Sequence, residues 1–320
     1  MPFNPVLQNE CMYVRVLGCA SAKPTLRFAP TCQTIHLRGK TFMVDCGEGA
    51  QRQMIKYGVS YANLHRIFLS HLHGDHCLGL PGLLSTMSLH GFTHPVHIYG
   101  PVGTAKLVRM IVELFCTDDT DRIIVHEVSH TSSELIYEDK SVQINTVPLH
   151  HRVPTVGYIF RERALLPHLD RASADFHGVP VSYFNRIKQG EDFVKPDGTV
   201  VPHKDLTHPA REPYSYAFCS DTAYAPSIVP YIEGVDLLYH ETTFAQDMQE
   251  RAKQTYHSTT LQAAQIAVLA KVKHLLIGHY SARYMTHDAV KMLQAECQLV
   301  FPNTLAASDG LLVDFSELRC

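Results

Sequence analysis

The chain has 320 residues, which is enough for one large domain or two modest ones and for a substantial apolar core. Its 28 lysines and arginines against 31 acidic residues give a formal net charge of −3, and charged residues make up 18 % of the chain. This composition excludes wholesale disorder and a basic coat that binds nucleic acid through overall charge. A nucleic-acid partner would therefore need a local basic patch or a bound metal.

Cysteine usage and the absence of long apolar runs indicate the compartment. The nine cysteines are odd in number, scattered, and include no Cys-x-x-Cys pair, which fits a reducing cytosol. The first ten residues lack a basic stretch followed by an apolar one, and nowhere do 18 uncharged apolar residues run together. We therefore expect a cytoplasmic protein with no membrane span. The 21 histidines are the one compositional anomaly.

The first half of the chain alternates short β-rich runs with helical segments. Runs of β-branched and aromatic residues between turn signals predict strands over residues 13–17, 33–37, 41–45, 67–70, 96–99, 123–128, 141–147 and 156–160. Helices are predicted over residues 48–57, which have helical composition, over 78–90, which Pro81 interrupts near its start, and over 101–115, which Pro101 begins.

The composition changes between residues 161 and 213, which hold six prolines and the turn Pro196-Asp197-Gly198. This segment is expected to be an irregular inserted arm. Alternation then resumes, with strands over 216–219, 236–239 and 274–277 and helices over 258–270 and 287–296. The sequence thus predicts two similar α/β halves flanking an arm, with no tandem repeat.

A histidine cluster follows the strand predicted at 67–70, in the stretch Ser70-His71-Leu72-His73-Gly74-Asp75-His76. In a loop leaving a strand, His71 and His73 can point to one metal while Asp75 and His76 point to its neighbour. Imidazole and carboxylate ligands suit zinc, and an open coordination position would make the site catalytic. The alternative is an incidental, solvated loop of histidines.

Three further candidate ligands, His151, Asp221 and His279, each follow a β-rich run. We expect them along one sheet edge. Taken singly, each would be an ordinary loop residue. Together with the histidine cluster they become ligands of a two-metal site, which needs more than four protein ligands.

With these residues in place, the sequence resembles the metallo-β-lactamase superfamily. His71-x-His73-x-Asp75-His76 matches its second motif, and Asp45, His151, Asp221 and His279 match the other four. More narrowly, the chain resembles the short form of the ribonuclease Z family in the segments 44–51, 69–84, 240–244, 257–260 and 281–284. The resemblance implies an α/β fold, an αββα sandwich of two mixed sheets flanked by helices. It covers residues 1–320 as one domain, with the arm at 161–213 as an insertion.

The resemblance also implies an activity, that of a zinc-dependent endoribonuclease with two Zn²⁺ ions per subunit. It would remove the 3′ trailer of precursor tRNA, leaving a 3′-OH on the tRNA and a 5′-phosphate on the trailer. His71, His73, Asp75, His76, His151, Asp221 and His279 would hold the metals. The family places its third-motif ligand six residues before a Gly-Tyr pair, here Gly157-Tyr158, which selects His151 over His150.

The remaining catalytic roles are assigned by the same resemblance. Asp75 would also orient the nucleophile, and His257 would protonate the leaving oxygen while Glu241 fixes its tautomer. Asp45 would orient a ligand histidine without touching the metal. For His257, the alternative is a structural histidine at a helix start, just before the good cap Ser258.

Substrate contacts are expected from four side chains. Arg283 and Tyr284 would bind a backbone phosphate and stack or hydrogen-bond nearby, although a salt-bridged turn is the structural alternative. The arm resembles in position the exosite that grips tRNA, and Arg186 and Lys188 lie in its best basic and aromatic patch. A solubilising or dimer-contact insertion is the alternative for the arm. The resemblance implies a homodimer, in which one subunit's arm holds tRNA cut by the other.

One loop departs from the family pattern. Pro24-Thr25-Leu26-Arg27-Phe28 lacks the family's asparagine, which bears on precursors with an encoded CCA end. Two other functions compete with the ribonuclease: a metal-dependent phosphodiesterase acting on small phosphate esters, and a non-catalytic RNA-binding or scaffold protein. The intact set of metal-ligand residues argues against the scaffold.

Overall fold

The computed structural model describes residues 12–91, 94–116, 121–284 and 286–319. The chain separates into two compact units, one formed by the residues up to Arg161 and from Tyr214 onward, the other by Glu162–Pro213. Among the described helices, none combines the length and the apolar character that a membrane crossing requires.

The first unit contains a seven-stranded mixed sheet built from the N-terminal half and one C-terminal strand. In spatial order its strands are β18 (Leu312–Asp314), β1 (Tyr13–Gly18), β2 (Cys32–Leu37), β3 (Lys40–Val44), β4 (Leu64–Phe68), β5 (Val96–Gly100) and β6 (Ile123–Glu127). Strands β18 to β3 pair antiparallel, and β3 to β6 pair parallel.

A second seven-stranded sheet completes the unit. In spatial order its strands are β17 (Thr304–Ala306), β16 (His274–Gly278), β15 (Leu237–Glu241), β14 (Ser215–Cys219), β9 (Val156–Glu162), β8 (Val142–Pro148) and β7 (Leu135–Glu138). Strands β14 to β17 run parallel, whereas β9 pairs antiparallel with β14. The parallel strands share one direction, so their carboxyl ends meet at one edge of the sheet.

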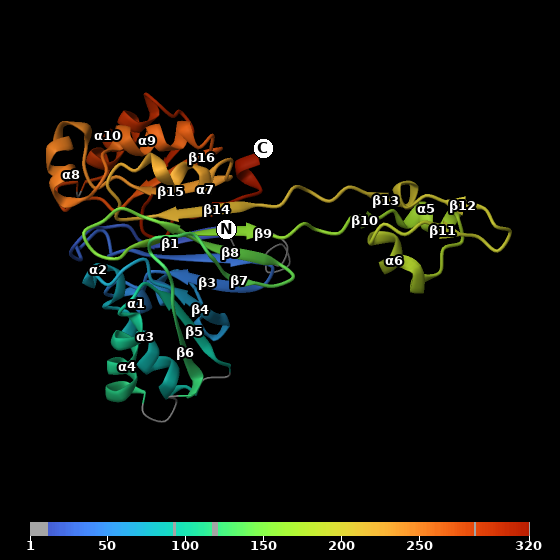
Figure 1. The fold of residues 1–320 in the computed structure, drawn as a ribbon, viewed down its shortest axis with the longest axis horizontal. Coiled ribbons are helices and arrows are strands. Elements are labelled where there is room, and N and C mark those ends of the chain that lie inside the picture. The colour runs from blue at the N-terminus through green and yellow to red at the C-terminus, as the bar shows by residue number, and fades with distance from the viewer. Residues whose placement is uncertain (1–11, 92–93, 117–120, 285, 320) are drawn as a thin grey trace. The chain divides into compact units, whose positions relative to one another are not determined.

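Helices cover the outer faces of the two sheets (Figure 1). The first sheet is covered by α1 (Ala50–Lys56), α3 (Leu80–Leu89) and α4 (Thr104–Phe115), and the second by α7 (Val229–Ile232), α8 (Gln249–Thr255), α9 (Thr260–Leu269) and α10 (His287–Gln298). Two mixed sheets flanked by helices are the αββα sandwich predicted from the sequence, and that prediction is confirmed.

Alternation along the strands explains the layers. On β3, Phe42 and Val44 belong to the apolar core between the sheets, whereas Met43 belongs to the core beneath the helices. The ring of Phe42 lies 5.7 Å from that of Phe160 on β9, across the sandwich. A fully buried aromatic side chain of this kind stabilises the fold by about 1.5–3 kcal/mol. Both sheet faces of the first sheet are thus buried, which fixes the strand register.

Some predicted boundaries were wrong. The strand expected at 67–70 is β4, Leu64–Phe68, because the chain leaves the ladder before the histidine loop. The helix expected from residue 258 starts at Thr260, with Thr259 and Gln262 forming a capping box, so Ser258 is not the cap. The short strands β7, β17 and β18 and the helices α2 (Gly74–Cys77) and α8 were not predicted.

The second unit is more regular than the expected irregular arm. It contains α5 (Arg171–Phe176), α6 (Phe184–Lys188) and two short antiparallel pairs, β10 (His168–Leu169) with β13 (Thr207–His208) and β11 (Phe193–Val194) with β12 (Val200–Val201). Six buried side chains, Ala174, Val179, Ile187, Phe193, Val201 and Leu206, form a core of its own. The predicted turn is present, with Gly198 at φ 86° between β11 and β12.

Candidate metal centre

The candidate ligands all follow strand ends of the first unit. His71 and His73 lie in the loop between β4 and α2, which itself carries Asp75 and His76. His151 follows β8, Asp221 follows β14, and His279 follows β16. The last three strands belong to one sheet, as expected, while β4 belongs to the other. The candidate site therefore takes its residues from both halves of the sandwich.

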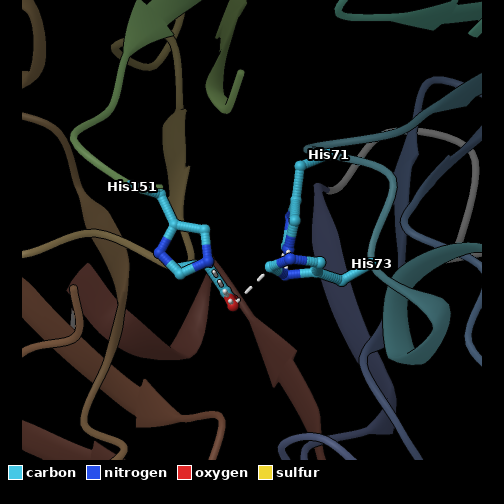
Figure 2. A group of neighbouring side chains, drawn as sticks. His71, His73 and His151 are labelled. Atoms are coloured by element: carbon cyan, nitrogen blue, oxygen red, sulfur yellow. Dashed lines mark hydrogen bonds and ion pairs between the residues drawn. The ribbon is translucent and has the colours of Figure 1, made fainter. Parts of the chain in front are cut away.

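His71, His73, His151 and Asp221 form a first group, whose ligand atoms lie within 4.8 Å of one another. Figure 2 shows the three imidazoles pointing toward one another. Nε2 of His71 lies 2.8 Å from Nδ1 of His73 and 3.6 Å from Oδ2 of Asp221. The same oxygen lies 3.9 Å from Nε2 of His151.

Asp75, His76 and His279 form a second group. Oδ2 of Asp75 lies 3.6 Å from Nε2 of His76 and 3.5 Å from Nε2 of His279. Oδ1 of Asp221 lies 3.2 Å from each of these two nitrogens. The Asp221 carboxylate thus presents one oxygen to each group.

The far nitrogens of the imidazoles are held by the protein. Nδ1 of His151 donates to the carbonyl oxygen of Tyr256 at 2.9 Å, and Nδ1 of His279 donates to the hydroxyl of Thr243 at 2.8 Å. In the neutral form of each imidazole, Nε2 then carries a lone pair, and Nε2 of His151 is buried without a hydrogen-bond partner among the described residues. Imidazole and carboxylate donors that converge in this way fit a divalent metal ion.

Asp45 lies behind the two groups and belongs to neither. Its carboxylate accepts hydrogen bonds from Nδ1 of His76 at 2.7 Å and from the hydroxyl and backbone N–H of Ser70 at 2.8 and 2.7 Å. That hydroxyl in turn accepts from Nδ1 of His71 at 3.0 Å. Asp45 is therefore hydrogen-bonded to His76 directly and to His71 through Ser70, one histidine of each group.

Glu241 and His257 form a hydrogen-bonded pair beside these groups, and a ring nitrogen of His257 also lies within 4.8 Å of ligand atoms of Asp221 and His279. Oε1 of Glu241 accepts from Nδ1 of His257 at 2.7 Å, and Glu241 also accepts from the backbone N–H groups of Thr222 and Thr243, each at 3.0 Å. Burial disfavours the imidazolium, but the Glu241 carboxylate outweighs it and raises the pKa of His257 to about 9. Nε2 of His257 is left to face the site.

The two acidic groups among the candidate ligands are held ionised. Burial favours the neutral acid, but the imidazoles of His279 and His76 outweigh it and hold the pKa of Asp221 well below its usual value. The same two imidazoles hold the pKa of Asp75 low against the same burial. Carboxylates in this state are the form that binds cations.

Three of these residues adopt a backbone conformation that L-residues rarely occupy. Asp45, Asp221 and His279 have φ angles of 57°, 56° and 60°, in the left-handed region. Each such residue costs about 1–3 kcal/mol, which the surrounding structure must offset. The sharp turn lets a side chain at a strand end point along the sheet edge into the site.

The two groups open onto a cavity of about 430 Å³. Its walls include His73, Asp75, Asp221 and His257, together with Ser21, Ala22, Gly74, His151, Arg152, Arg251, Thr255 and His279. His150 is exposed and packs its ring 5.6 Å from that of Tyr256, outside both ligand groups. His151, and not His150, is the member of the first ligand group, and its role as a ligand stays a prediction.

The predicted substrate-binding residues have different surroundings. Arg283 is exposed and donates to the hydroxyl of Ser281 at 3.2 Å. Tyr284 is buried, and its hydroxyl accepts from the backbone N–H of Ala245 at 3.0 Å, so the ring has no free face for stacking on a substrate. The substrate roles of both residues stay predictions.

In the arm, the guanidinium of Arg186 is engaged on two sides. Its Nε donates to Glu191 at 2.7 Å, and it lies 4.1 Å from the centre of the Tyr183 ring. Lys188 ends α6, and like Arg186 it keeps its RNA-binding role as a prediction.

Sequence reasoning missed several supporting residues. Ser70 directly precedes His71, so a hydroxyl next to a ligand histidine was the available signal. Thr243 lies 36 residues from His279, whose Nδ1 it contacts, so the sequence carried no such signal for it. The backbone N–H of Ala22, which donates to Oδ2 of Asp75 at 2.6 Å, carries no side-chain signal. The two arginines of the cavity, Arg152 and Arg251, also went unnoticed because they lie outside the metal motifs.

Comparison with known proteins gives the family. The family model of the anti-Pycsar protein Apyc1 matches residues 12–156. The ribonuclease Z of Porphyromonas gingivalis is 46 % identical over 301 residues, covering 94 % of this chain and 98 % of that protein. The ribonuclease Z of Bacteroides thetaiotaomicron is 47 % identical over 308 residues, covering 96 % of each. The chain belongs to the ribonuclease Z family.

As a member of this family, the chain is an endoribonuclease, a phosphodiester hydrolase. Solved structures agree on the fold. The short form of human tRNase Z aligns with a TM-score of 0.67 at 24 % identity, covering 94 % of this chain and 98 % of that one. The metallo-β-lactamase fold protein YhfI of Bacillus subtilis aligns with a TM-score of 0.67 at 20 % identity, covering 95 % of this chain and all of that one. The predicted resemblance to ribonuclease Z is confirmed.

Proposed function

We propose that this ribonuclease Z removes the 3′ trailer of precursor tRNA, leaving a 3′-OH on the tRNA and a 5′-phosphate on the trailer. The observation that carries the mechanism is the Asp221 carboxylate, which presents one oxygen to each of two ligand groups beside the His257–Glu241 pair. A site with two adjacent cation positions and a separate proton donor suits hydrolysis of a phosphodiester.

Zinc is the metal we propose, two ions per subunit. His71, His73 and His151 would hold one ion, Asp75, His76 and His279 the other, with Asp221 shared. Imidazole nitrogens outnumber carboxylate oxygens in this donor set, which favours zinc over magnesium or calcium. When bound, the ions would lower the pKa of water toward about 7 and neutralise charge on the scissile phosphate.

The residues of the chain supply the remaining steps. The departing ribose 3′ oxygen is a poor leaving group and needs a proton, which Nε2 of His257 would donate. Glu241 holds Nδ1 of His257 at 2.7 Å and so keeps the proton-bearing Nε2 toward the cavity. Asp75 would orient the attacking water, and the 2.6 Å hydrogen bond from Ala22 keeps its carboxylate in place.

Substrate capture and assembly are part of the same proposal. The Glu162–Pro213 unit would hold the tRNA away from the cleaved bond, with Arg186 and Lys188 on its α6. Its separate core supports a role as a distinct binding module. The enzyme would act in the cytoplasm as a homodimer, one subunit's arm holding tRNA that the other subunit cuts.

The experiment is to incubate purified zinc-loaded protein with two precursor tRNAs, one with and one without an encoded CCA, and to map each 3′ end to the nucleotide. A chelator-sensitive cut just after the discriminator base of the precursor without CCA is expected. The second precursor reports whether the altered loop at residues 24–28 matters. If neither precursor is cut while a small phosphodiester is hydrolysed, the protein is a phosphodiesterase of small esters instead.

A further inference from the structure

Two arginine side chains line the cavity described above. Arg152 and Arg251 are exposed side chains in its wall, alongside His73 and His257. Within the described part of the chain, neither guanidinium forms an ion pair or a hydrogen bond. Some arginines elsewhere are paired with carboxylates, as in Arg319–Asp236 and Arg211–Glu162. The wall of the cavity thus contains two positively charged side chains whose guanidinium groups have no partner among the described residues.

The backbone holds both arginines near the proton donor. Arg152 follows His151, whose Nδ1 is bonded to the carbonyl of Tyr256 at 2.9 Å. Arg251 lies in α8, and its carbonyl accepts from the hydroxyl of Thr255 at 2.8 Å. The next residue, Ala252, accepts from the backbone N–H of His257 at 2.9 Å. Both arginines therefore belong to segments whose backbone contacts the residues around His257.

The carboxylates in the cavity do not account for these cations. Asp75 and Asp221 face the ligand histidines at 3.2–3.6 Å, not the arginines. An uncommitted guanidinium is suited to a phosphate, which it can bind through two parallel hydrogen bonds. The scissile phosphate would be taken up by the metal groups, so the arginines are left for another one.

We infer that Arg152 and Arg251 form a cationic clamp for the backbone phosphate of a nucleotide next to the scissile bond. The inference rests on the proposed function and deepens it, because it gives the site a preference for a nucleic-acid chain over a small diester. A small diester has one phosphate and no second group to engage the clamp. Arg152 and Arg251 would be specificity residues rather than catalytic ones.

A purely electrostatic role makes a different prediction. If the arginines only offset the negative charge of the candidate ligands, removing them would change metal affinity and leave RNA binding to the metal-free protein unaffected. A phosphate contact instead releases counterions, so it contributes to the salt dependence of RNA binding whether or not metal is present. Salt dependence therefore separates the two roles.

The test measures binding of a fluorescent precursor tRNA to metal-free protein at several salt concentrations. Arg152→Ala and Arg251→Ala should each raise Kd about tenfold and lower the slope of log Kd against log salt by about 0.7–1. The lysine variants should recover part of the affinity, because charge remains but the two-pronged geometry is lost. Arg109→Ala, an exposed arginine of α4 outside the cavity, is the matched control and should match the wild type.

A second, kinetic experiment compares zinc-loaded wild type and variants that contain equal amounts of bound metal. For each clamp variant, kcat/KM should fall at least about tenfold more on precursor tRNA than on bis(p-nitrophenyl) phosphate. The clamp would be wrong if both alanine variants bound precursor tRNA with the salt dependence of the wild type and kept the wild-type ratio of kcat/KM on the two substrates. If the wild-type protein binds the precursor but does not cut it, the proposed function is wrong. The clamp is then still tested by the salt dependence of binding in the variants. No binding of the precursor by the wild type would overturn both.

Discussion

Oε1 of Glu241 accepts a hydrogen bond from Nδ1 of His257 at 2.7 Å, and this contact decides which nitrogen of His257 faces the cavity. The carboxylate is buried and its other hydrogen bonds come from Thr222 and Thr243, so it has little freedom to turn. His257 is therefore held as a proton donor with a defined direction.

Replacing His257 by alanine should slow cleavage of precursor tRNA by about 10²–10⁴-fold, the usual contribution of a general acid. The loss should shrink on a nitrophenyl phosphodiester, because nitrophenolate leaves without a proton. His150→Ala, which removes a neighbouring exposed imidazole, is the control and should have little effect. Equal losses on both substrates would mean that His257 does not donate the proton to the leaving group.

Asp45 should control metal affinity without touching the metal. Asp45→Asn places an amide N–H₂ group where Ser70 and His76 now donate, so at least one of these hydrogen bonds is lost. We expect zinc affinity to fall about 10–100-fold, measured by competition with a coloured chelator. Asparagine tolerates the φ of 57° at this position, so the substitution leaves the backbone turn in place. If the zinc affinity of the variant equals that of the wild type, Asp45 does not help to orient the metal ligands.

Two glycines near the histidine loop should respond oppositely to alanine. A Cβ on Gly79 would lie 2.1 Å from the carbonyl oxygen of Gly47, so Gly79→Ala must push apart two backbone segments. We expect a loss of more than about 2 kcal/mol in the free energy of unfolding. Gly82→Ala meets only the side-chain oxygen of Gln51 at 3.8 Å, inside α3, and should gain about 0.5–1 kcal/mol. Urea denaturation measures both, and equal signs would contradict the packing described.

Asp309 should make stability depend on pH in an unusual direction. Burial raises the pKa of Asp309 to about 6, against 3.8 for the ordinary carboxyl. Between these values the folded state keeps a proton that the unfolded state releases, so the contribution of Asp309 to stability falls as pH rises through this window. It is fully regained below about pH 4, where both states are protonated.

The check compares the wild type with Asp309→Asn, which cannot ionise. Relative to the wild type, the variant should be more stable at pH 7 than at pH 4, by on the order of 2–3 kcal/mol. The difference between the two proteins cancels other titrating groups, because these are common to both. A difference in urea midpoint that stays constant with pH would contradict the raised pKa.

The arm should be separable from the sandwich. Arg161 and Ser215 are register partners on β9 and β14, so a short Gly/Ser turn can replace Glu162–Pro213 without moving either strand. We expect the deletion variant to fold, to hydrolyse a small diester, and to lose most precursor cleavage.

Mixing the deletion variant with a His73→Ala chain tests the predicted dimer. Recovered cleavage is expected, because the arm of one chain would then serve the intact metal site of the other. If the deleted protein alone cuts precursor tRNA at the wild-type rate, the arm has no part in substrate capture.

The sequence predicted those features that depend on local pattern. Alternation located the central strands, such as β3 around Met43, and the spacing of His71, His73 and His76 indicated the ligand loop before any contact was visible. Short edge strands such as β7 were missed because their sequences carry weak alternation and rely on a neighbour for hydrogen bonds.

Long-range supports of the site were beyond sequence reasoning. Asp221 and His279 have left-handed backbone angles that the surrounding structure must hold in place, and nothing in either residue type requires them. The same holds for the carbonyl of Tyr256, which fixes His151 across 105 residues of chain. Contacts of this kind become visible only once the halves of the sandwich are placed together.

The carboxylate of Asp221 belongs to both ligand groups, so neither group is complete alone. Occupancy of the two positions is therefore thermodynamically linked: an ion in one position orients the shared carboxylate for the other. Metal uptake by this enzyme should be cooperative, with few half-loaded molecules at intermediate zinc. A cell whose free zinc falls below that threshold would lose the activity of this protein abruptly rather than in proportion.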